Sequence, residues 1–286
     1  MIFDRIAILD WSAAKGPKRG KDSIWLAKTA GEDCDAQNHA TRSDAERALG
    51  DLMAESLSCG DRLLLGVDFA FGAPAGFIAG LTGQATALSW WSWLAARITE
   101  TPQNISNYRN IAAEMNGHFP GDGPFWGNGE KAQIPGLPRL KPDLPPGLRP
   151  YRATDLAARA PGASPKPVWQ LAGAGAVGAQ VLTGIPVLER LRHRFADHVS
   201  VWPFQSPTRP IVMTEVYPSL LADPVRALQH ATGMVTDEAQ VRLLATALRR
   251  LDADAMGHLF TLPYPAPEEG WILGAGQADR LRNALG

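Results

Sequence analysis

Apolar positions near the start of the chain predict two paired strands and then a buried strand. An apolar run ends at Asp10, a loop rich in glycine and lysine follows, and a second apolar run covers 23–27. Two short apolar runs joined in this way predict a β-hairpin with a long loop. The uninterrupted run at 63–67 is stopped by Asp68 and a Gly/Pro turn, which is typical of a strand buried in a parallel sheet.

Helical spacing of apolar residues predicts further elements. A helix of about a dozen residues is expected from Ser43, with Ser43 as its N-cap and Glu46 as the capping-box partner. Residues 239–251 carry apolar side chains on one side and arginines elsewhere, which predicts an amphipathic helix. The segment 170–195 also has helical character, and Pro186 is expected to break it because proline cannot join the hydrogen-bond ladder.

The composition is that of an ordinary globular protein. The 286 residues are 45% hydrophobic and 20% charged, with 28 Lys and Arg against 29 Asp and Glu. This length can bury a core without disulfides, and the near-neutral charge argues against tight non-specific DNA binding. Two cysteines without CxxC spacing, and a start that lacks a secretory pattern, favour a cytoplasmic location. The uncharged stretch 169–188 holds glycines, glutamines and a proline, so we expect a buried helix there and no membrane span.

Carboxylates stand at the ends of three apolar runs. Asp10 and Asp68 end the first two, and Glu215 lies at the far end of a predicted strand at 210–218. A charge at the end of a buried strand is costly unless it is paired, hydrogen-bonded or bound to a cation. If their strands are neighbours, Asp10 and Asp68 could share a divalent ion, with Asp237 completing the cluster; oxygen ligands favour Mg²⁺ or Mn²⁺. The alternative is that these acids cap turns or pair with arginines.

Positive charge follows the first acid directly. The loop after Asp10 holds candidate phosphate contacts, which are Ser12, Lys15, Lys18 and Arg19. It lacks the order GxxxxGK[ST], which excludes a P-loop. A second strip, between Lys131 and Lys166, has seven basic residues against two acids, and Lys166 is a further candidate phosphate contact. This strip is either a solvated surface loop or a surface that receives phosphates.

Tryptophans are frequent, with nine in the chain. Trp90, Trp91 and Trp93 stand close together and could form a stacking platform for bases. We expect them instead to anchor the core, because large aromatic side chains dominate protein interiors.

Four segments together resemble one known family. They are the Asp10 hairpin, the sequence GVDFAFG at 66–72, the strand end at 215–218 and the segment 269–272. These segments are similar to the domain of unknown function 429 family, whose members are predicted ribonuclease-H-like nucleases. In the middle of the chain, two stretches look like signatures of a subgroup, namely 166–171 and 178–180.

The resemblance covers both ends of the chain, roughly 1–80 and 205–275. It implies an α/β fold, a ribonuclease-H-like mixed sheet flanked by helices, with an antiparallel hairpin at one edge. Residues 1–286 then form a single domain. A large Pro/Gly-rich and helical insertion, 90–205, interrupts it in the middle.

The resemblance also implies a site. Asp10 would be the acid of the first strand, Asp68 that of the fourth strand and Glu215 a further ligand of two divalent ions. The last acid of the family begins a DxxDA-like helix; here Asp237 keeps the first acid, and Gln240 stands where a second would fall. Alternative ligands near the end of the following helix are Asp252 and Asp254.

These features together predict a metal-dependent, nuclease-like phosphodiesterase that acts on nucleic acid or a nucleotide-like substrate. Asp10, Asp68, Glu215 and Asp237 would be its catalytic acids, with Mg²⁺ or Mn²⁺ bound to the first three. Two alternatives stay open, because ribonuclease-H-like folds host many functions. They are a nucleotide-dependent phosphotransferase and a non-catalytic binding or scaffolding protein. The sequence does not fix the oligomeric state.

Overall fold

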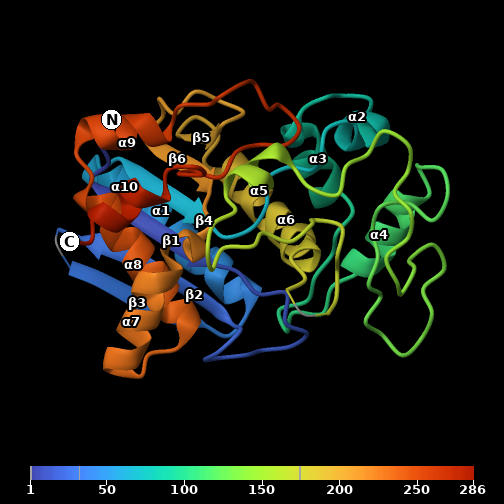
Figure 1. Cartoon of the computed structure of the whole chain (residues 1–286), viewed down its shortest axis with the longest axis horizontal. Coiled ribbons are helices and arrows are strands. Elements are labelled where there is room, and N and C mark those ends of the chain that lie inside the picture. Colours follow the sequence, from blue (N-terminus) through green and yellow to red (C-terminus); the bar gives the residue numbers. More distant parts are fainter. Residues whose placement is uncertain (1, 32, 174) are drawn as a thin grey trace.

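A six-stranded mixed sheet organises the protein in the computed structural model, which describes residues 2–31, 33–173 and 175–286 (Figure 1). The strands are β1 Arg5–Asp10, β2 Ile24–Ala30, β3 Asp33–His39, β4 Leu63–Val67, β5 Val199–Trp202 and β6 Ile211–Glu215. Their order across the sheet is β3-β2-β1-β4-β6-β5. β1, β2 and β3 pair antiparallel, whereas β1, β4, β6 and β5 run parallel.

Helices cover both faces of the sheet. They are α1 Arg42–Cys59, α2 Phe77–Thr82, α3 Ala87–Ala95, α4 Tyr108–Asn116, α5 Ala153–Ala157, α6 Gly178–Arg194, α7 Ala222–Thr232, α8 Thr236–Arg250, α9 Ala253–Leu259 and α10 Ala278–Asn283, with a 3₁₀ turn at Pro218–Leu221. α8 packs across β1, β2 and β3. α1, α3 and α6 share a core with the opposite face.

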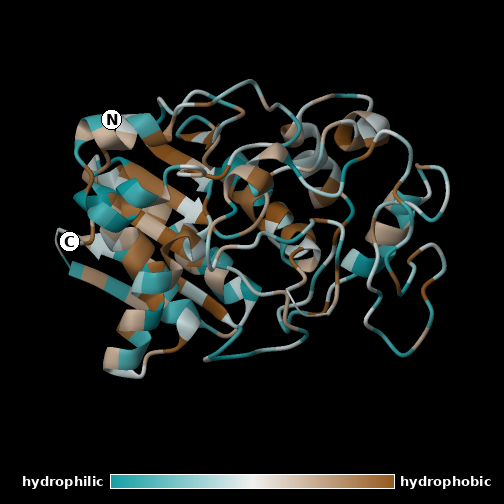
Figure 2. Cartoon of the chain, viewed as in Figure 1, coloured by the Kyte–Doolittle hydropathy of each residue, from teal (hydrophilic) through white to brown (hydrophobic). Residues whose placement is uncertain are grey.

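Alternation along the central strands builds these two cores. In β1, Ile6 and Ile8 join the cluster that contains α8, whereas Ala7 and Leu9 join the cluster with α1 and α6. Successive strand side chains point to opposite faces, so a strand covered by helices on both sides is apolar throughout. Figure 2 shows hydrophobic residues concentrated in the sheet and along α6.

The expected hairpin and buried strand are confirmed. β1 and β2 pair antiparallel, with Ala7 opposite Lys28 and Asp10 opposite Trp25. The run 63–67 is β4, buried throughout and parallel to β1. The predicted strand at 210–218 contains β6 but is too long, because β6 ends at Glu215 and a 3₁₀ turn begins at Pro218. The predicted helix at 239–251 is α8, which begins three residues earlier.

The predicted start of the first long helix was wrong by two residues. Thr41, not Ser43, is the N-cap, and its hydroxyl accepts a hydrogen bond from the Asp44 N–H at 3.1 Å. Glu46 closes no capping box and instead pairs with Arg190 of α6 at 2.6 Å. The helix has 18 residues, because its buried side packs on β2, β3 and α6 well beyond the apolar stretch that first indicated it.

The break expected at Pro186 does not occur. α6 runs uninterrupted from Gly178 to Arg194 with Pro186 inside it, and the residues of 170–177 that are described are not helical. Pro186 removes one backbone donor. Leu182, Ile185 and Leu188 are almost fully buried, and tertiary packing of this kind, rather than local propensity, supplies most of a helix's stability.

Two strands carry no apolar signal strong enough to predict them. β3, DCDAQNH, is an edge strand whose residues are largely exposed or half-buried. β5 has four residues and lies at the other edge. Polar and short edge strands are common because they discourage pairing with other chains.

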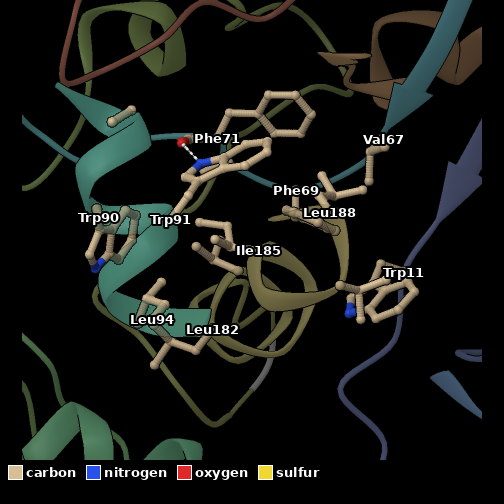
Figure 3. Close-up of a cluster of buried hydrophobic side chains, with 14 of the residues drawn as sticks. Trp11, Val67, Phe69, Phe71, Trp90, Trp91, Leu94, Leu182, Ile185 and Leu188 are labelled. Carbon is tan, nitrogen blue, oxygen red and sulfur yellow. Dashed lines mark hydrogen bonds between the residues drawn. The ribbon is translucent and has the colours of Figure 1, made fainter. Parts of the chain in front are cut away.

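The middle of the chain packs beside the parallel half of the sheet around an aromatic core (Figure 3). Trp90 and Trp91 are fully buried, which confirms their expected role as anchors. The Trp91 indole donates to the carbonyl of Phe71 at 2.8 Å. Residues 117–152 form turns and isolated bridges; that 90–205 is an insertion into a single domain stays a prediction. In the part of the chain that the structure describes, no helix combines the length and the apolarity needed to cross a membrane.

Candidate acidic site at the carboxyl edge of the sheet

The carboxyl ends of β1, β4 and β6 meet at one edge of the sheet. The parallel register places Ile8 beside Gly66 and Val67 beside Glu215. The Asp68 N–H donates to the carbonyl of Leu9 at 2.9 Å, so Asp68 follows β4 where Asp10 ends β1. The condition set by the sequence, that the strands of Asp10 and Asp68 be neighbours, is therefore met.

Three carboxylates form what we call the three-acid group: Asp10, Asp68 and Asp237. Asp10 and Asp237 are each 9% exposed, and Asp68 is half-buried. Burial, then the charges of Asp68 and Asp237, raises the pKa of Asp10 well above its usual value. Burial, then Glu215 and Asp237, raises the pKa of Asp68 to about 7. No described lysine, arginine or histidine forms an ion pair with any of the three.

The third acid comes from a helix and not from the end of a strand. Asp237 is in the first turn of α8, and its carboxylate accepts the backbone N–H of Asp22 at 2.5 Å. This bond ties α8 to the hairpin loop, where Asp22 has a positive φ of 54°. Burial raises the pKa of Asp237, and the hydrogen bond from Asp22 opposes the shift. Asp10 and Asp237 line one pocket of about 180 Å³, together with Ser12, Asp22 and Gln240.

Glu215 lies beside this group but is neutralised by an arginine. Its two oxygens bind Arg152 at 2.6 and 2.7 Å, and one also accepts the Phe71 N–H at 3.0 Å. Arg152 also pairs with Asp155 at 2.7 Å, and all three side chains are at most 5% exposed. We call these residues the Arg152 cluster. To bind a metal ion as the sequence predicted, Glu215 would have to break this pair.

A second pocket, of about 100 Å³, joins the two groups. Asp68 lines it together with Arg152, Lys166 and Tyr217. Burial raises the pKa of Tyr217, which keeps its hydroxyl protonated and able to donate. The exposed Lys166, a predicted phosphate contact, lines this pocket together with Asp68 of the three-acid group.

The cations of the hairpin loop lie elsewhere. Lys15 pairs with Glu130 at 3.3 Å, Lys18 pairs with Asp22 at 3.5 Å, and Arg19 donates to the Asn38 carbonyl. None of them lines either pocket. Ser12 does line the acid pocket, and its hydroxyl donates to the carbonyl of Asp22 at 3.0 Å.

The acids fit an oxygen-ligated divalent ion only in a limited sense. Among the described residues, no set of three or more Asp, Glu, His or Cys side chains converges as a metal site. Mg²⁺, however, is commonly held by one or two carboxylates and completed by water and substrate phosphates. The neighbouring Asp10 and Asp68 offer such a pair. Asp252 has a different role, because its carboxylate caps α9 by accepting the N–H groups of Asp254 and Ala255.

Sequence reasoning missed the residues that complete the site. Arg152 was one of the basic residues counted in the strip before Lys166, and nothing local distinguished it from its exposed neighbours. Gln180 belonged to the stretch 178–180, whose resemblance to a subgroup signature carried no role. Comparison with family models, curated proteins and solved structures found no match to this chain.

Proposed function

We propose that the chain is a metal-dependent phosphodiesterase that acts on nucleic acid or a nucleotide-like substrate. The observation that carries the proposal is the three-acid group. Three carboxylates from β1, the end of β4 and the start of α8 are gathered at one edge, and two of them are 9% exposed. No described lysine, arginine or histidine forms an ion pair with them. Burial of such acids in the ionised form is unfavourable unless a ligand supplies positive charge.

The topology supports the same proposal by analogy. The sheet has an antiparallel hairpin at one edge, helices on both faces and acids on adjacent central strands, as the resemblance to ribonuclease-H-like nucleases implies. A fold of this kind hosts several chemistries. The argument for phosphodiester hydrolysis therefore rests on the site.

Each residue of the site has its own role in the proposed reaction. Asp10 and Asp68 would hold a Mg²⁺ or Mn²⁺ ion. When bound, such an ion activates water and stabilises a leaving oxygen. Lys166 offers an ammonium group to a substrate phosphate. Without the ion, Asp68 has a pKa of about 7, so near neutral pH it can release its proton and bind the cation.

Calorimetric titration with Mn²⁺ tests the metal site. We expect binding by the wild type and at least tenfold weaker binding by Asp10→Asn and by Asp68→Asn, since each variant removes one charge from the pair. Asp197→Asn is the matched control, because that side chain is 99% exposed and its ion pair with Arg209 is long, at 4.0 Å. Because Mg²⁺-type ions often bind weakly without phosphate, the titration is repeated with a short oligonucleotide. Absence of binding in both titrations, or equal binding in all variants, would overturn the metal site.

Hydrolysis assays then distinguish a phosphodiesterase from the two alternatives, a phosphotransferase and a non-catalytic protein. The proposal predicts Mn²⁺-dependent cleavage of bis(p-nitrophenyl) phosphate and of short oligonucleotides, lost in Asp10→Asn. Transfer of phosphate from a nucleotide without diester cleavage would indicate a phosphotransferase. Metal binding without either reaction would favour a binding or scaffolding protein.

A further inference from the structure

Gln180 stands at the junction of the two pockets. It lies in the first turn of α6, and it lines both the pocket of Asp10 and Asp237 and the pocket of Asp68 and Lys166. No other described residue borders both. A ligand that occupied both acid pockets would therefore contact its side chain.

The chain after Asp10 holds this side chain in place. The Gln180 Nε2 donates to the carbonyl of Trp11 at 2.6 Å. The Trp11 indole, 1% exposed, donates to the Thr183 hydroxyl at 3.1 Å, about one turn further along α6. Two hydrogen bonds thus fix the first turn of α6 against the end of β1. A rigid element of this kind positions a polar group more accurately than a loop does.

The hydrogen bond to the Trp11 carbonyl determines which end of the Gln180 amide is free. A backbone carbonyl only accepts, so the amide nitrogen must face Trp11 and the amide oxygen must be the other end. Among the described residues, no donor bonds to that oxygen. The charged groups around the two pockets are Asp10, Asp22, Asp68, Arg152, Asp155, Lys166, Glu215 and Asp237. None of these side chains is hydrogen-bonded to the Gln180 amide oxygen, and Arg152 is engaged by Glu215 and Asp155.

We infer that the Gln180 side-chain carbonyl is a ligand-contacting group that accepts a hydrogen bond from a water molecule held between Asp10 and Asp68. The inference rests on the proposed function for the purpose of that water, which is attack on a phosphodiester. It extends the proposal because it assigns a role to a neutral residue on a helix outside the sheet.

A charge placed at this position tests the geometry without metal. At pH 8 in EDTA, Gln180→Glu adds a carboxylate to the three-acid group, whereas Gln180→Met keeps the length of the side chain and adds no charge. Gln277 is the matched control, because its Nε2 also donates to a backbone carbonyl, that of His258 at 3.1 Å. We expect the melting temperature of Gln180→Glu to be about 3 °C or more below that of Gln180→Met. Gln277→Glu and Gln277→Met should show no such difference in melting temperature. Equal differences in melting temperature at the two positions would overturn the inference.

Mn²⁺ and a diester give the second readout. Gln180→Glu should bind Mn²⁺ about tenfold more tightly than Gln180→Met, because the new oxygen faces the acids. With bis(p-nitrophenyl) phosphate, Gln180→Met should lower kcat at least tenfold with KM changed less than twofold, while Gln277→Met retains kcat. Unchanged kcat in Gln180→Met would contradict the role. If the wild type neither binds Mn²⁺ nor cleaves the diester, the proposed function fails, and the melting comparison still decides where the amide oxygen points.

Discussion

Two groups of acids lie side by side at the carboxyl edge of the sheet, and their charges are balanced in different ways. In the Arg152 cluster, one guanidinium binds Glu215 and Asp155, and all three side chains are almost completely buried. In the three-acid group, no described lysine, arginine or histidine forms an ion pair with Asp10, Asp68 or Asp237. Burial raises the pKa of each of them, and it also raises the pKa of Glu215, where Arg152 opposes the shift. The same edge thus holds one balanced and one unbalanced set of carboxylates.

The difference indicates which set is structural. A buried acid bound by a buried arginine needs nothing from outside, and Arg152 also donates to the carbonyl of Glu269, which ties α5 to the segment after α9. Acids without a cation in an ion pair can still bind a cation or a proton. From the sequence alone, Asp10, Asp68 and Glu215 are equally good candidates for metal ligands. The structure distinguishes Glu215 from the other two, because Glu215 forms an ion pair with Arg152.

The largest effect on stability is expected from removing the cation of the Arg152 cluster. Arg152→Met leaves two buried carboxylates without their cation, which should lower the free energy of unfolding by about 3–5 kcal/mol. Urea denaturation followed by circular dichroism measures the loss.

The control for this variant adds Glu215→Gln and Asp155→Asn to Arg152→Met. Because the triple variant leaves no unpaired charge in the Arg152 cluster, it should regain part of the lost stability. A loss below about 1 kcal/mol in Arg152→Met would contradict a structural role for the pair.

An intermediate effect on stability, of opposite sign, is expected when one acid of the three-acid group is neutralised. The folded state holds the proton of Asp68 up to a pKa of about 7, whereas an unfolded aspartate releases it near 3.9. Stability from this proton is therefore present at low pH and lost as the pH rises from about 4 to 7. In EDTA, Asp68→Asn should exceed the wild type by on the order of 2 kcal/mol at pH 8, discounted for partial exposure.

Urea denaturation at pH 4, 6 and 8 checks this prediction. The advantage of Asp68→Asn should be absent at pH 4, grow through pH 6 and level off above pH 7. Asp197→Asn should show no such trend, because its side chain is 99% exposed. An Asp68→Asn variant that is less stable than the wild type at pH 8 would show that a protein group already balances the charge.

The smallest effect on stability is expected at Lys166. Its exposed side chain lines the pocket beside Asp68, so Lys166→Ala should change the free energy of unfolding by less than about 0.5 kcal/mol. The same variant should weaken binding of inorganic phosphate in the presence of Mn²⁺ by about tenfold, measured by calorimetry. Lys15→Ala, which removes a cation paired with Glu130, should leave phosphate binding unchanged; equal losses in both would move the phosphate contact to the hairpin loop.

Much of the sheet follows from local pattern, and much of the site does not. The hairpin, the strand 63–67 and the acids at their ends could be predicted, because strands buried on both faces are apolar throughout and a carboxylate ends each run. The edge strand 33–39 could not be predicted, since polar residues in a partly exposed strand resemble a loop. Pro186 predicted a break that packing around α6 prevents.

The sequence by itself determined which residues form the central strands and that carboxylates stand at their ends, because hydrophobic periodicity is a property of neighbouring residues. Only the tertiary structure decided which acids meet each other and which meet a cation. Arg152 and Glu215 are 63 residues apart in sequence, and Asp22 and Asp237 are 215 apart. Charge balance in a buried site depends on distance in space, and that distance is set by how strands and helices pack rather than by any local pattern.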